Sequence, residues 1–347
     1  MTWNRRQLLQ LGGAALAAAS LPSLAEPENP KAGVIRPKRL KKGDVVGLIN
    51  PAGATFRPER AEITREALAA LGLRTRFGEH LFDRRGYLAG RDEDRAADVN
   101  SFFADPEVGA ILAQEGGWGC NRILPLLDYD LIRNNPKIVM GYSDLTGLIL
   151  GIHAKTGLVT FHGPMGSSSW NAFTTDHATR LLFDGEAISM ENRMGNEDRL
   201  VQRENRVLNI TSGRARGRLV GGNLTVLAAI VGSGYLPDFE GRILFLEDTN
   251  EEIYRVDRML TQLALAGVLG KISGFVFGDC KNCGPGGGYG SLTLGEVLDH
   301  HVAPLGIPAW YGSMIGHIED KFTVPLGIEA EIDADAGTIK LLESAVV

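Results

Sequence analysis

The sequence predicts an α/β protein with two domains, and three observations support this fold class. The chain has 347 residues, a length that suits roughly two domains of about 100–200 residues each. Short apolar runs of strand length alternate with stretches of helical periodicity. Many of these runs end in turns rich in glycine, of which the chain has 44. Such alternation is typical of a parallel sheet covered by helices.

The first half of the chain carries this alternation from about residue 40. Apolar runs and helical periodicity predict strands over 45–49, 108–113 and 138–140, and helices over 58–71, 91–103 and 145–155. Glycine-rich turns join several strands to the helices that follow them. We therefore expect an N-terminal parallel α/β domain over residues 40–185.

A second domain is expected after a connecting segment. Residues 186–213 begin with a charged stretch that has no sustained apolar period, and we expect them to be a linker. Beyond them a helix opens at Leu224, and apolar strands over 243–246 and 272–277 flank another helix. Residues 214–347 are therefore predicted to form a C-terminal mixed α/β domain.

Residues 1–25 have the pattern of an export signal and are not expected to belong to the fold. The pair Arg5-Arg6 precedes a weakly apolar stretch, and small residues stand at positions −3 and −1 of a cleavage site before Glu26. The pattern resembles the twin-arginine type. The alternative is a frayed cytosolic helix, which the lack of acidic residues before Glu26 disfavours. We therefore expect a periplasmic protein.

Composition and charge exclude several classes of protein. Hydrophobic residues make up 44% of the chain and charged residues 22%, as in globular proteins. The formal net charge of −6 argues against an electrostatic grip on nucleic acid, and no apolar run reaches the roughly 18 residues of a membrane span. Three cysteines are too few for a four-cysteine zinc site. Cys280 and Cys283 could form a local disulfide or remain thiols.

The strongest local signal for chemistry lies in residues 138–146. A predicted strand runs through Gly141 to Ser143 and then directly into an apolar helix. This is the layout of a nucleophile elbow, in which a sharp turn exposes a serine hydroxyl beside the N–H groups of a helix start. Leu145 replaces the second glycine of lipase elbows, and a serine that only caps the helix is the alternative. The sequence contains no phosphate loop and no dinucleotide fingerprint.

A serine nucleophile needs a histidine base, and the residues alone leave two candidates open. His153 lies ten positions along the same helix, about 15 Å away at roughly 1.5 Å per residue, and cannot reach the serine. His162 and His317 each lie in a glycine-flanked turn after an apolar segment. Their surroundings do not choose between them.

Five segments follow one another along the chain and together cover nearly all of it from about residue 40. The segments are Gly116-Gly117-Trp118-Gly119, Gly141-Tyr142-Ser143-Asp144, Gly221-Gly222-Asn223-Leu224, residues 246–260, and Gly316-His317-Ile318-Glu319-Asp320 followed by Pro325-Leu326-Gly327. In this order they resemble the LD-carboxypeptidase family of serine peptidases, which includes the microcin C immunity hydrolases. Family members often carry arginine just before the first segment, where this chain has Glu115, so a pocket role of that arginine is not expected here.

The resemblance implies both a fold and a site. The implied fold is a flavodoxin-like N-terminal domain and a swivelling-type C-terminal domain, with the site in the cleft between them. The implied catalytic triad is Ser143, His317 and Glu247. The backbone N–H groups of Gly117 and Asp144 would form the oxyanion hole.

The resemblance also implies a reaction. We expect an exported serine carboxypeptidase that hydrolyses an L,D amide bond and releases the terminal D-alanine of murein tetrapeptides. Trp118 and Asn223 are expected to contact this murein peptide, and no metal or cofactor is expected. A homodimer is a further, open expectation. The alternatives are a microcin-immunity-like hydrolase of acyl-sulfamoyl adenylates, which export disfavours, and a non-catalytic periplasmic murein-peptide binding protein.

Among the acidic residues near the third triad position, the sequence favours Glu247. The unbroken apolar run over 243–246 predicts a strand covered on both faces, whose end would hold a carboxylate rigidly. Because successive side chains alternate across a strand, Asp248 is expected to point away from the direction of Glu247. Glu251 and Glu252 are expected to add negative charge at the start of the next helix. The alternative for Glu247 is a cap or a bridge to a nearby arginine.

Overall fold

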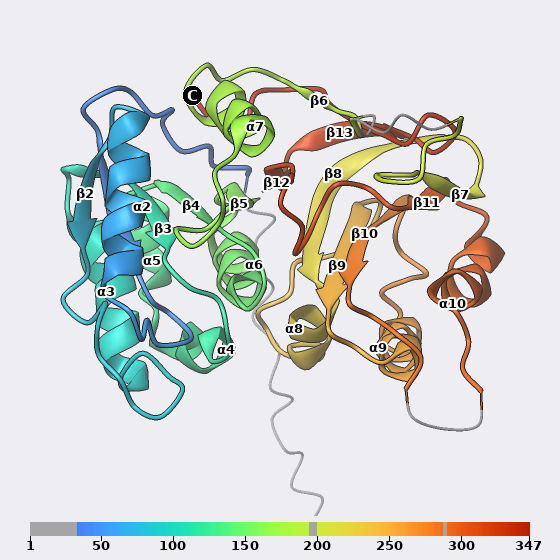
Figure 1. Ribbon diagram of the computed structural model, residues 1–347, viewed down its shortest axis with the longest axis horizontal. Helices are drawn as coiled ribbons and strands as arrows, with labels where there is room; N and C mark the ends of the chain where they lie inside the picture. Colours follow the sequence, from blue (N-terminus) through green and yellow to red (C-terminus); the bar gives the residue numbers. More distant parts are fainter. Residues whose placement is uncertain (1–32, 194–199, 287–289) are drawn as a thin grey trace, which may run out of the picture. The chain divides into compact units, whose positions relative to one another are not determined.

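Two β-sheets organise the described part of the chain. The computed structural model describes residues 33–193, 200–286 and 290–347. Figure 1 shows most of the first sheet on the left, in blue to green, and most of the second on the right, in yellow to red. Both sheets lie within one unit, Gly33–Val347. This architecture confirms the predicted α/β fold class. The predicted export signal lies outside the described residues.

The first sheet has five parallel strands and one antiparallel edge strand. In spatial order they are β2 (Arg74–Phe77), β1 (Val45–Ile49), β3 (Val108–Ala113), β4 (Ile138–Gly141), β5 (Thr160–His162) and β12 (Val324–Leu326). The first five follow the flavodoxin-like order of doubly wound sheets. In such sheets, ligands bind beyond the carboxyl ends of the strands at the point where the chain order reverses, which here lies between β1 and β3.

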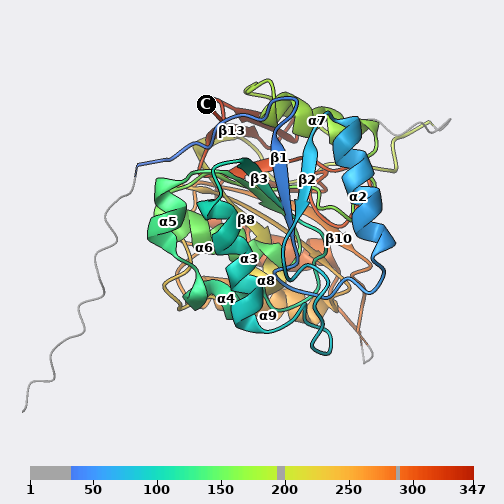
Figure 2. The ribbon, with the colours of Figure 1, turned by 90° about the vertical axis from the view of Figure 1, so that its left-hand side faces the viewer.

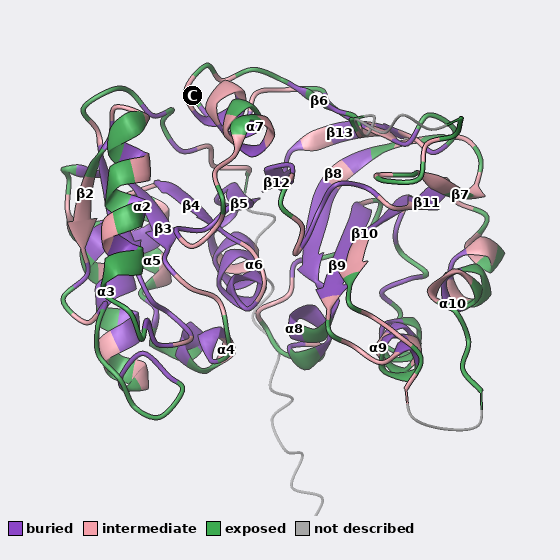
Figure 3. Ribbon diagram, viewed as in Figure 1, coloured by how far each residue is buried: buried purple, intermediate pink, exposed green. Residues whose placement is uncertain are grey.

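Helices lie on both faces of the first sheet. Figure 2 shows α2 on one side and α3, α5 and α6 on the other. Nearly all of α6 is buried, as its purple colour in Figure 3 shows, because it also contacts β8 and α8 of the second half. The bounds are α2 (Glu59–Ala70), α3 (Asp92–Ala104), α4 (Cys120–Ile123), the 3₁₀ turn η1 (Leu124–Leu126), α5 (Tyr129–Asn134), α6 (Leu145–Thr156) and α7 (Ala172–Leu182).

The second sheet is mixed. Its strands, in spatial order, are β6 (Ser189–Met190), β14 (Thr338–Leu341), β13 (Glu329–Asp333), β8 (Arg214–Asn223), β9 (Ile243–Thr249), β10 (Gly274–Lys281), β11 (Ala309–Tyr311) and β7 (Leu208–Thr211). The central strands β8 to β11 are parallel, and the outer strands pair antiparallel. Its helical segments are α8 (Leu224–Ala229), α9 (Ile253–Leu265), α10 (Leu294–His301) and the 3₁₀ turn η2 (Ala303–Leu305).

The chain crosses back to the first sheet near its end. After β11, residues 312–323 lead to β12, which pairs with β5 so that Val324 lies opposite His162. Between the two halves, the N–H of Asn223 also donates a hydrogen bond to Thr146 Oγ1 at 2.9 Å. The loop 312–323 is therefore anchored to both sheets.

The predicted elements form with some shifted ends. The strand expected over 272–277 begins at Gly274 and runs to Lys281. The strand expected over 243–246 continues to Thr249, because the polar residues Glu247 and Asp248 that follow the apolar run are also buried in the strand. The expected linker, 186–213, includes β6 and β7, which pair as edge strands of the second sheet. The domain boundaries themselves stay predictions.

Two further points concern the cysteines and membranes. Cys280 and Cys283 form a disulfide, the first of the two arrangements that the sequence left open. Cys120 is a buried free thiol. No helix among the described residues has the length and apolar character needed to cross a membrane.

Candidate active site

Ser143 lies in the turn between β4 and α6. Its φ angle is 62°, in the left-handed region that residues other than glycine rarely adopt. Strained backbone of this kind clusters at functional sites. Because β4 ends at Gly141 and α6 begins at Leu145, the strand turns sharply into the helix, as the sequence predicts. The Ser143 side chain is left partly exposed.

A glycine-rich loop after β3 lies against Ser143. A Cβ atom added to Gly116 would lie 3.3 Å from Ser143 Oγ, so this approach favours a residue without a side chain. The Gly116 carbonyl accepts a hydrogen bond from the N–H of Gly53 at 2.9 Å, which holds the loops after β1 and β3 together. Ser143 therefore lies beside the reversal point of the doubly wound sheet, where such folds bind ligands.

Gly117 and Asp144 carry the N–H groups predicted to form an oxyanion hole. Within the described residues, neither N–H has a protein acceptor. The Asp144 carboxylate instead accepts the N–H of Cys120 at 2.7 Å, which ties the start of α6 to the loop after β3. Burial raises the pKa of Asp144. Both N–H groups are available to an anionic oxygen, and their role stays a prediction.

Glu247 and His317 meet although they are 70 positions apart in the chain. His317 Nδ1 lies 2.7 Å from Glu247 Oε2. The Glu247 side chain is fully buried, whereas that of His317 is 17% exposed. Gly316, with a φ angle of 125°, allows the contact, because a Cβ atom there would lie 2.8 Å from Glu247 Oε2. The imidazole therefore has one edge on a buried carboxylate and part of its surface open.

His162, the other candidate base, lies on the opposite oxygen of the same carboxylate. Its Nε2 is 3.7 Å from Glu247 Oε1, too long for a hydrogen bond. Neither of these two atoms has a hydrogen-bond partner among the described residues. Burial alone would raise the pKa of Glu247, but the imidazoles of His162 and His317 stabilise the carboxylate and lower its pKa to about 2. Glu247 is therefore ionised at neutral pH.

Tyr142 links the elbow to this pair. Its ring centre lies 4.9 Å from that of His317 in an edge-to-face contact, and Tyr142 directly precedes Ser143. No hydrogen bond joins Ser143 to His317 in the part of the chain that the structure describes. Such bonds are often long in ligand-free sites and shorten when substrate binds. The structure thus places His317 against Glu247 and against the residue that precedes Ser143, and the catalytic roles of the three predicted triad residues stay predictions.

Asp248 faces away from Glu247 and accepts hydrogen bonds from neighbouring backbone and side-chain groups. Its carboxylate accepts hydrogen bonds from Asn223 Nδ2 at 3.1 Å, from the N–H and hydroxyl of Thr225, and from the N–H of Thr249. Burial raises the pKa of Asp248 to about 6. The Asn223 Oδ1 accepts the N–H of Val226 at the start of α8. Both the Nδ2 and the Oδ1 of the Asn223 side chain therefore bond to protein groups. Its contact with substrate stays a prediction.

Trp118 and Glu115 flank the glycines of the loop after β3. The Trp118 side chain is 53% exposed and packs edge-to-face on Tyr87, with ring centres 5.5 Å apart. The Arg122 guanidinium lies over the ring, 5.9 Å from its centre, and the predicted contact of Trp118 with substrate stays a prediction. Glu115 pairs with Arg60 at 3.0 Å. The position at which an arginine would add positive charge therefore holds a neutralised acidic side chain.

Lys321 was not singled out by the sequence. It follows Glu319 and Asp320, a charged run that is typical of a solvated loop. The structure instead buries its side chain, with 4% exposed, and places Nζ 4.9 Å from the centre of the Tyr142 ring. No pattern in the sequence distinguishes this lysine, because its burial follows from the return of residues 312–323 to the first sheet.

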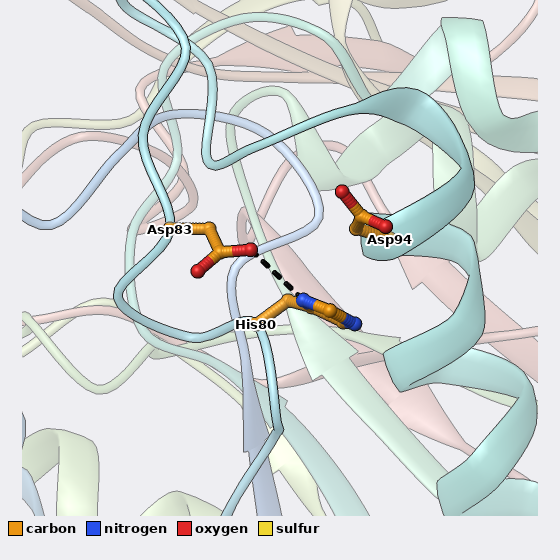
Figure 4. A group of neighbouring side chains, drawn as sticks. All are labelled: His80, Asp83 and Asp94. Atoms are coloured by element: carbon orange, nitrogen blue, oxygen red, sulfur yellow. Dashed lines mark hydrogen bonds and ion pairs between the residues drawn. The ribbon is translucent and has the colours of Figure 1, made fainter.

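A second group of polar side chains lies away from these residues. Figure 4 shows His80, Asp83 and Asp94, whose potential ligand atoms lie within 4.8 Å of one another. His80 Nδ1 pairs with Asp83 at 2.8 Å, and Arg91 bonds both oxygens of Asp94 at 2.8 and 2.7 Å. Ion pairs within the protein account for this group.

Comparison with known proteins identifies related sequences over both halves of the chain. Residues 46–163 match the family model described as LD-carboxypeptidase N-terminal domain, and residues 216–332 match the LD-carboxypeptidase C-terminal domain. The probable murein peptide carboxypeptidase of Bacillus subtilis is 39% identical over 298 residues, covering 86% of this chain and 91% of the relative. The murein tetrapeptide carboxypeptidase of Pseudomonas aeruginosa is 30% identical, covering 84% and 93%.

A solved structure agrees in fold. The microcin C7 self-immunity protein MccF in complex with aspartyl sulfamoyl adenosine superposes with a TM-score of 0.79 at 29% identity. The match covers 90% of this chain and 100% of that one. The two family matches include Ser143 in the first segment and Glu247 and His317 in the second.

Proposed function

The chain belongs to the LD-carboxypeptidase family, and we propose that it is a serine carboxypeptidase that releases the terminal D-alanine of murein tetrapeptides by hydrolysis of an L,D amide bond. The observation that carries the proposal is the 2.7 Å hydrogen bond between His317 and the fully buried Glu247 carboxylate, beside the Ser143 turn. A buried carboxylate that orients an imidazole near a serine is the arrangement of a catalytic triad.

In the proposed mechanism, Ser143 Oγ attacks the carbonyl carbon of the scissile amide. Because an ionised carboxylate only accepts hydrogen bonds, the shared proton resides on His317 Nδ1, which leaves Nε2 free to take the Ser143 proton. The imidazolium then gives that proton to the leaving amine nitrogen, and water hydrolyses the acyl-enzyme by the same proton route. Glu247 stabilises the imidazolium, and the N–H groups of Gly117 and Asp144 would stabilise the oxyanion.

Mass spectrometry of a purified murein tetrapeptide incubated with the protein tests the proposal. We expect a tripeptide and free D-alanine, and no product with S143A. An unchanged tetrapeptide, or release of a different fragment, would contradict the proposed reaction. Labelling of the wild type but not of S143A by a fluorophosphonate probe separates an enzyme from a non-catalytic murein-peptide binding protein.

A second candidate function is supported by the structural match to MccF, a protein solved with aspartyl sulfamoyl adenosine. The same serine mechanism could hydrolyse an acyl-sulfamoyl adenylate. Parallel assays with aspartyl sulfamoyl adenosine and with the murein tetrapeptide discriminate the two. We expect the tetrapeptide to be the better substrate by kcat/KM.

We also propose that the protein acts in the periplasm after twin-arginine export and cleavage before Glu26. The support is the pattern of Arg5-Arg6, the weakly apolar stretch and the small residues at the cleavage site. Mass spectrometry of the N-terminus of the periplasmic protein tests the cleavage site. Unchanged export of a variant with Arg5→Lys and Arg6→Lys would contradict the twin-arginine route.

A further inference from the structure

Lys321 lies on the loop that also carries His317, and its backbone is fixed in place. Its N–H donates a hydrogen bond to Thr174 Oγ1 of α7 at 3.1 Å, and the same hydroxyl donates to the carbonyl of Glu319 at 3.1 Å. From this anchored position the side chain extends to the Tyr142 ring. The ammonium therefore lies against the residue that precedes Ser143 and contacts His317.

The Lys321 side chain is buried, and its ammonium has no partner among the described residues. Only 4% of the residue is exposed, and within the described residues Nζ makes no hydrogen bond and no ion pair, so the Tyr142 ring is its one specific contact. A charge on a side chain this buried is costly when it has no partner. Burial lowers the pKa of Lys321 to about 8, although the charges of Glu247, Glu319 and Asp320 act in the opposite direction.

Another buried lysine shows how the protein supplies hydrogen-bond acceptors to an ammonium that has only a structural role. Lys137 is 7% exposed, and its Nζ donates hydrogen bonds to the carbonyls of Asp105 and Val108 at 2.5 and 2.6 Å. Lys321 has no such acceptors. Its ammonium is therefore placed to receive an acceptor that is not part of the described protein.

Other cations near the site are already neutralised. Arg60 pairs with Glu115, and Arg193 pairs with Asp320. Lys321 is thus a positive charge beside the Ser143 turn that has no acceptor among the described residues. In the substrate of a carboxypeptidase, one carbon separates the leaving nitrogen from a terminal carboxylate, so an anion must lie close to the attacked bond.

We propose that Lys321 is a specificity-determining residue whose ammonium binds the C-terminal carboxylate of the peptide substrate. The inference rests on the proposed carboxypeptidase function. A charge-assisted contact with this carboxylate would fix the terminal residue and select peptides that end at the leaving amino acid. Because the contact is made before and during the reaction, its loss should act mainly on KM.

Kinetics on a matched pair of substrates test the inference. The murein tetrapeptide with a free C-terminal carboxylate is compared with the same peptide as its C-terminal amide, for wild type, K321M, K321R and K137M. We expect wild type to prefer the acid, and K321M to lose about 100-fold in kcat/KM on the acid while its kcat/KM on the amide changes by less than about threefold. K321R should recover part of the preference, because it keeps the charge, and K137M should keep all of it.

The outcomes separate this inference from the proposed function. Loss of the acid-over-amide preference in K321M alone supports it. A K321M variant that keeps the preference, or that loses activity equally on both peptides, overturns it while leaving the carboxypeptidase function in place. If wild type does not cleave the tetrapeptide at all, both the proposed function and this inference are wrong. Circular dichroism of each variant confirms that the comparison is made between folded proteins.

Discussion

The Ser143 turn and the end of β9 both contribute to the candidate site. Residues close in sequence fix the turn, whereas residues distant in sequence fix the side chain at the end of β9. The turn is local: Ser143 is placed by its own φ angle and by the α6 helix that follows, where the N–H of Thr146 donates to the Ser143 carbonyl at 3.0 Å. Glu247, at the end of β9, is placed by residues far away in sequence. Its carboxylate depends on His317 and His162, which reach it from a loop and from the first sheet.

Stability and chemistry are coupled at the end of β9 and separate at the Ser143 turn. The Ser143 hydroxyl is partly exposed, so its removal leaves no buried group unsatisfied. The Glu247 carboxylate is fully buried, and the neighbouring imidazoles of His162 and His317 stabilise its ionised form. Changes at the turn should therefore affect the reaction alone. Changes around β9 should affect both activity and the free energy of unfolding, and how much each changes depends on the contacts that the altered residue makes.

The largest expected effect is at the turn. S143A should lower kcat by about 10⁶, as loss of a triad nucleophile does, while the free energy of unfolding changes by less than about 1 kcal/mol. Steady-state kinetics on the tetrapeptide and thermal unfolding measure the two quantities. Activity within tenfold of wild type would rule out the serine mechanism. A large loss of stability would show that the Ser143 hydroxyl also stabilises the fold.

The two histidines next to Glu247 should differ sharply in what their removal does to activity. H317A should lose activity nearly as completely as S143A, because only His317 hydrogen-bonds to the carboxylate and reaches solvent. H162A should keep kcat within about tenfold, while the cavity it leaves lowers the unfolding free energy by about 2–4 kcal/mol. Urea unfolding and kinetics on both variants measure the contrast. Equal losses of activity would mean that His162 also takes part in the reaction.

Adjacent carboxylates on β9 give the next contrast. E247Q should lower kcat by about 10²–10⁴, by analogy with removal of a triad acid, because the amide cannot stabilise the imidazolium. D248N should keep kcat within about tenfold, since Asp248 bonds to Thr225 and Asn223 and does not contact His317. Kinetics and melting temperatures are measured together. If D248N shows the large loss and E247Q does not, Glu247 is not the orienting acid.

The smallest expected effect is a difference in pH dependence. The folded-state pKa of Asp248, about 6, lies above its ordinary value of 3.8, so the ionised carboxylate destabilises the folded state above about pH 6. As pH falls from 6 to 4, wild type should gain up to about 3 kcal/mol of stability relative to D248N.

Glu247 should show the opposite sign. Its pKa of about 2 lies below the ordinary 4.5, so the stability it contributes is present above pH 4.5 and is lost as pH falls towards 2. Relative to E247Q, wild type should therefore weaken in that window. Urea midpoints at several pH values test both signs, and parallel curves for wild type and D248N would contradict the environment assigned to Asp248.

The sequence by itself determined the local features of this protein. Alternating apolar runs and helical periodicity predicted β1, β3, β4 and α6, because backbone hydrogen bonding and burial of one face act over a few neighbouring residues. The strand–serine–helix pattern predicted the turn at Ser143 for the same reason. The choice of Glu247 over Asp248 followed from the family resemblance and from the apolar run over 243–246, and side-chain alternation along the strand predicted that Asp248 points the other way.

Residue patterns did not show which distant side chains meet: the family resemblance implied that His317 and Glu247 act together, and the packing of the chain places them in contact. His162 and His317 could not be ranked from their surroundings in the sequence, and the structure places both on Glu247, one in hydrogen-bond contact and one at 3.7 Å. Lys321 lies in a charged run, and its burial against Tyr142 depends on the return of the chain from β11 to pair β12 with β5. The physical reason is that burial and pairing of charges depend on long-range packing, which no local pattern of residues encodes.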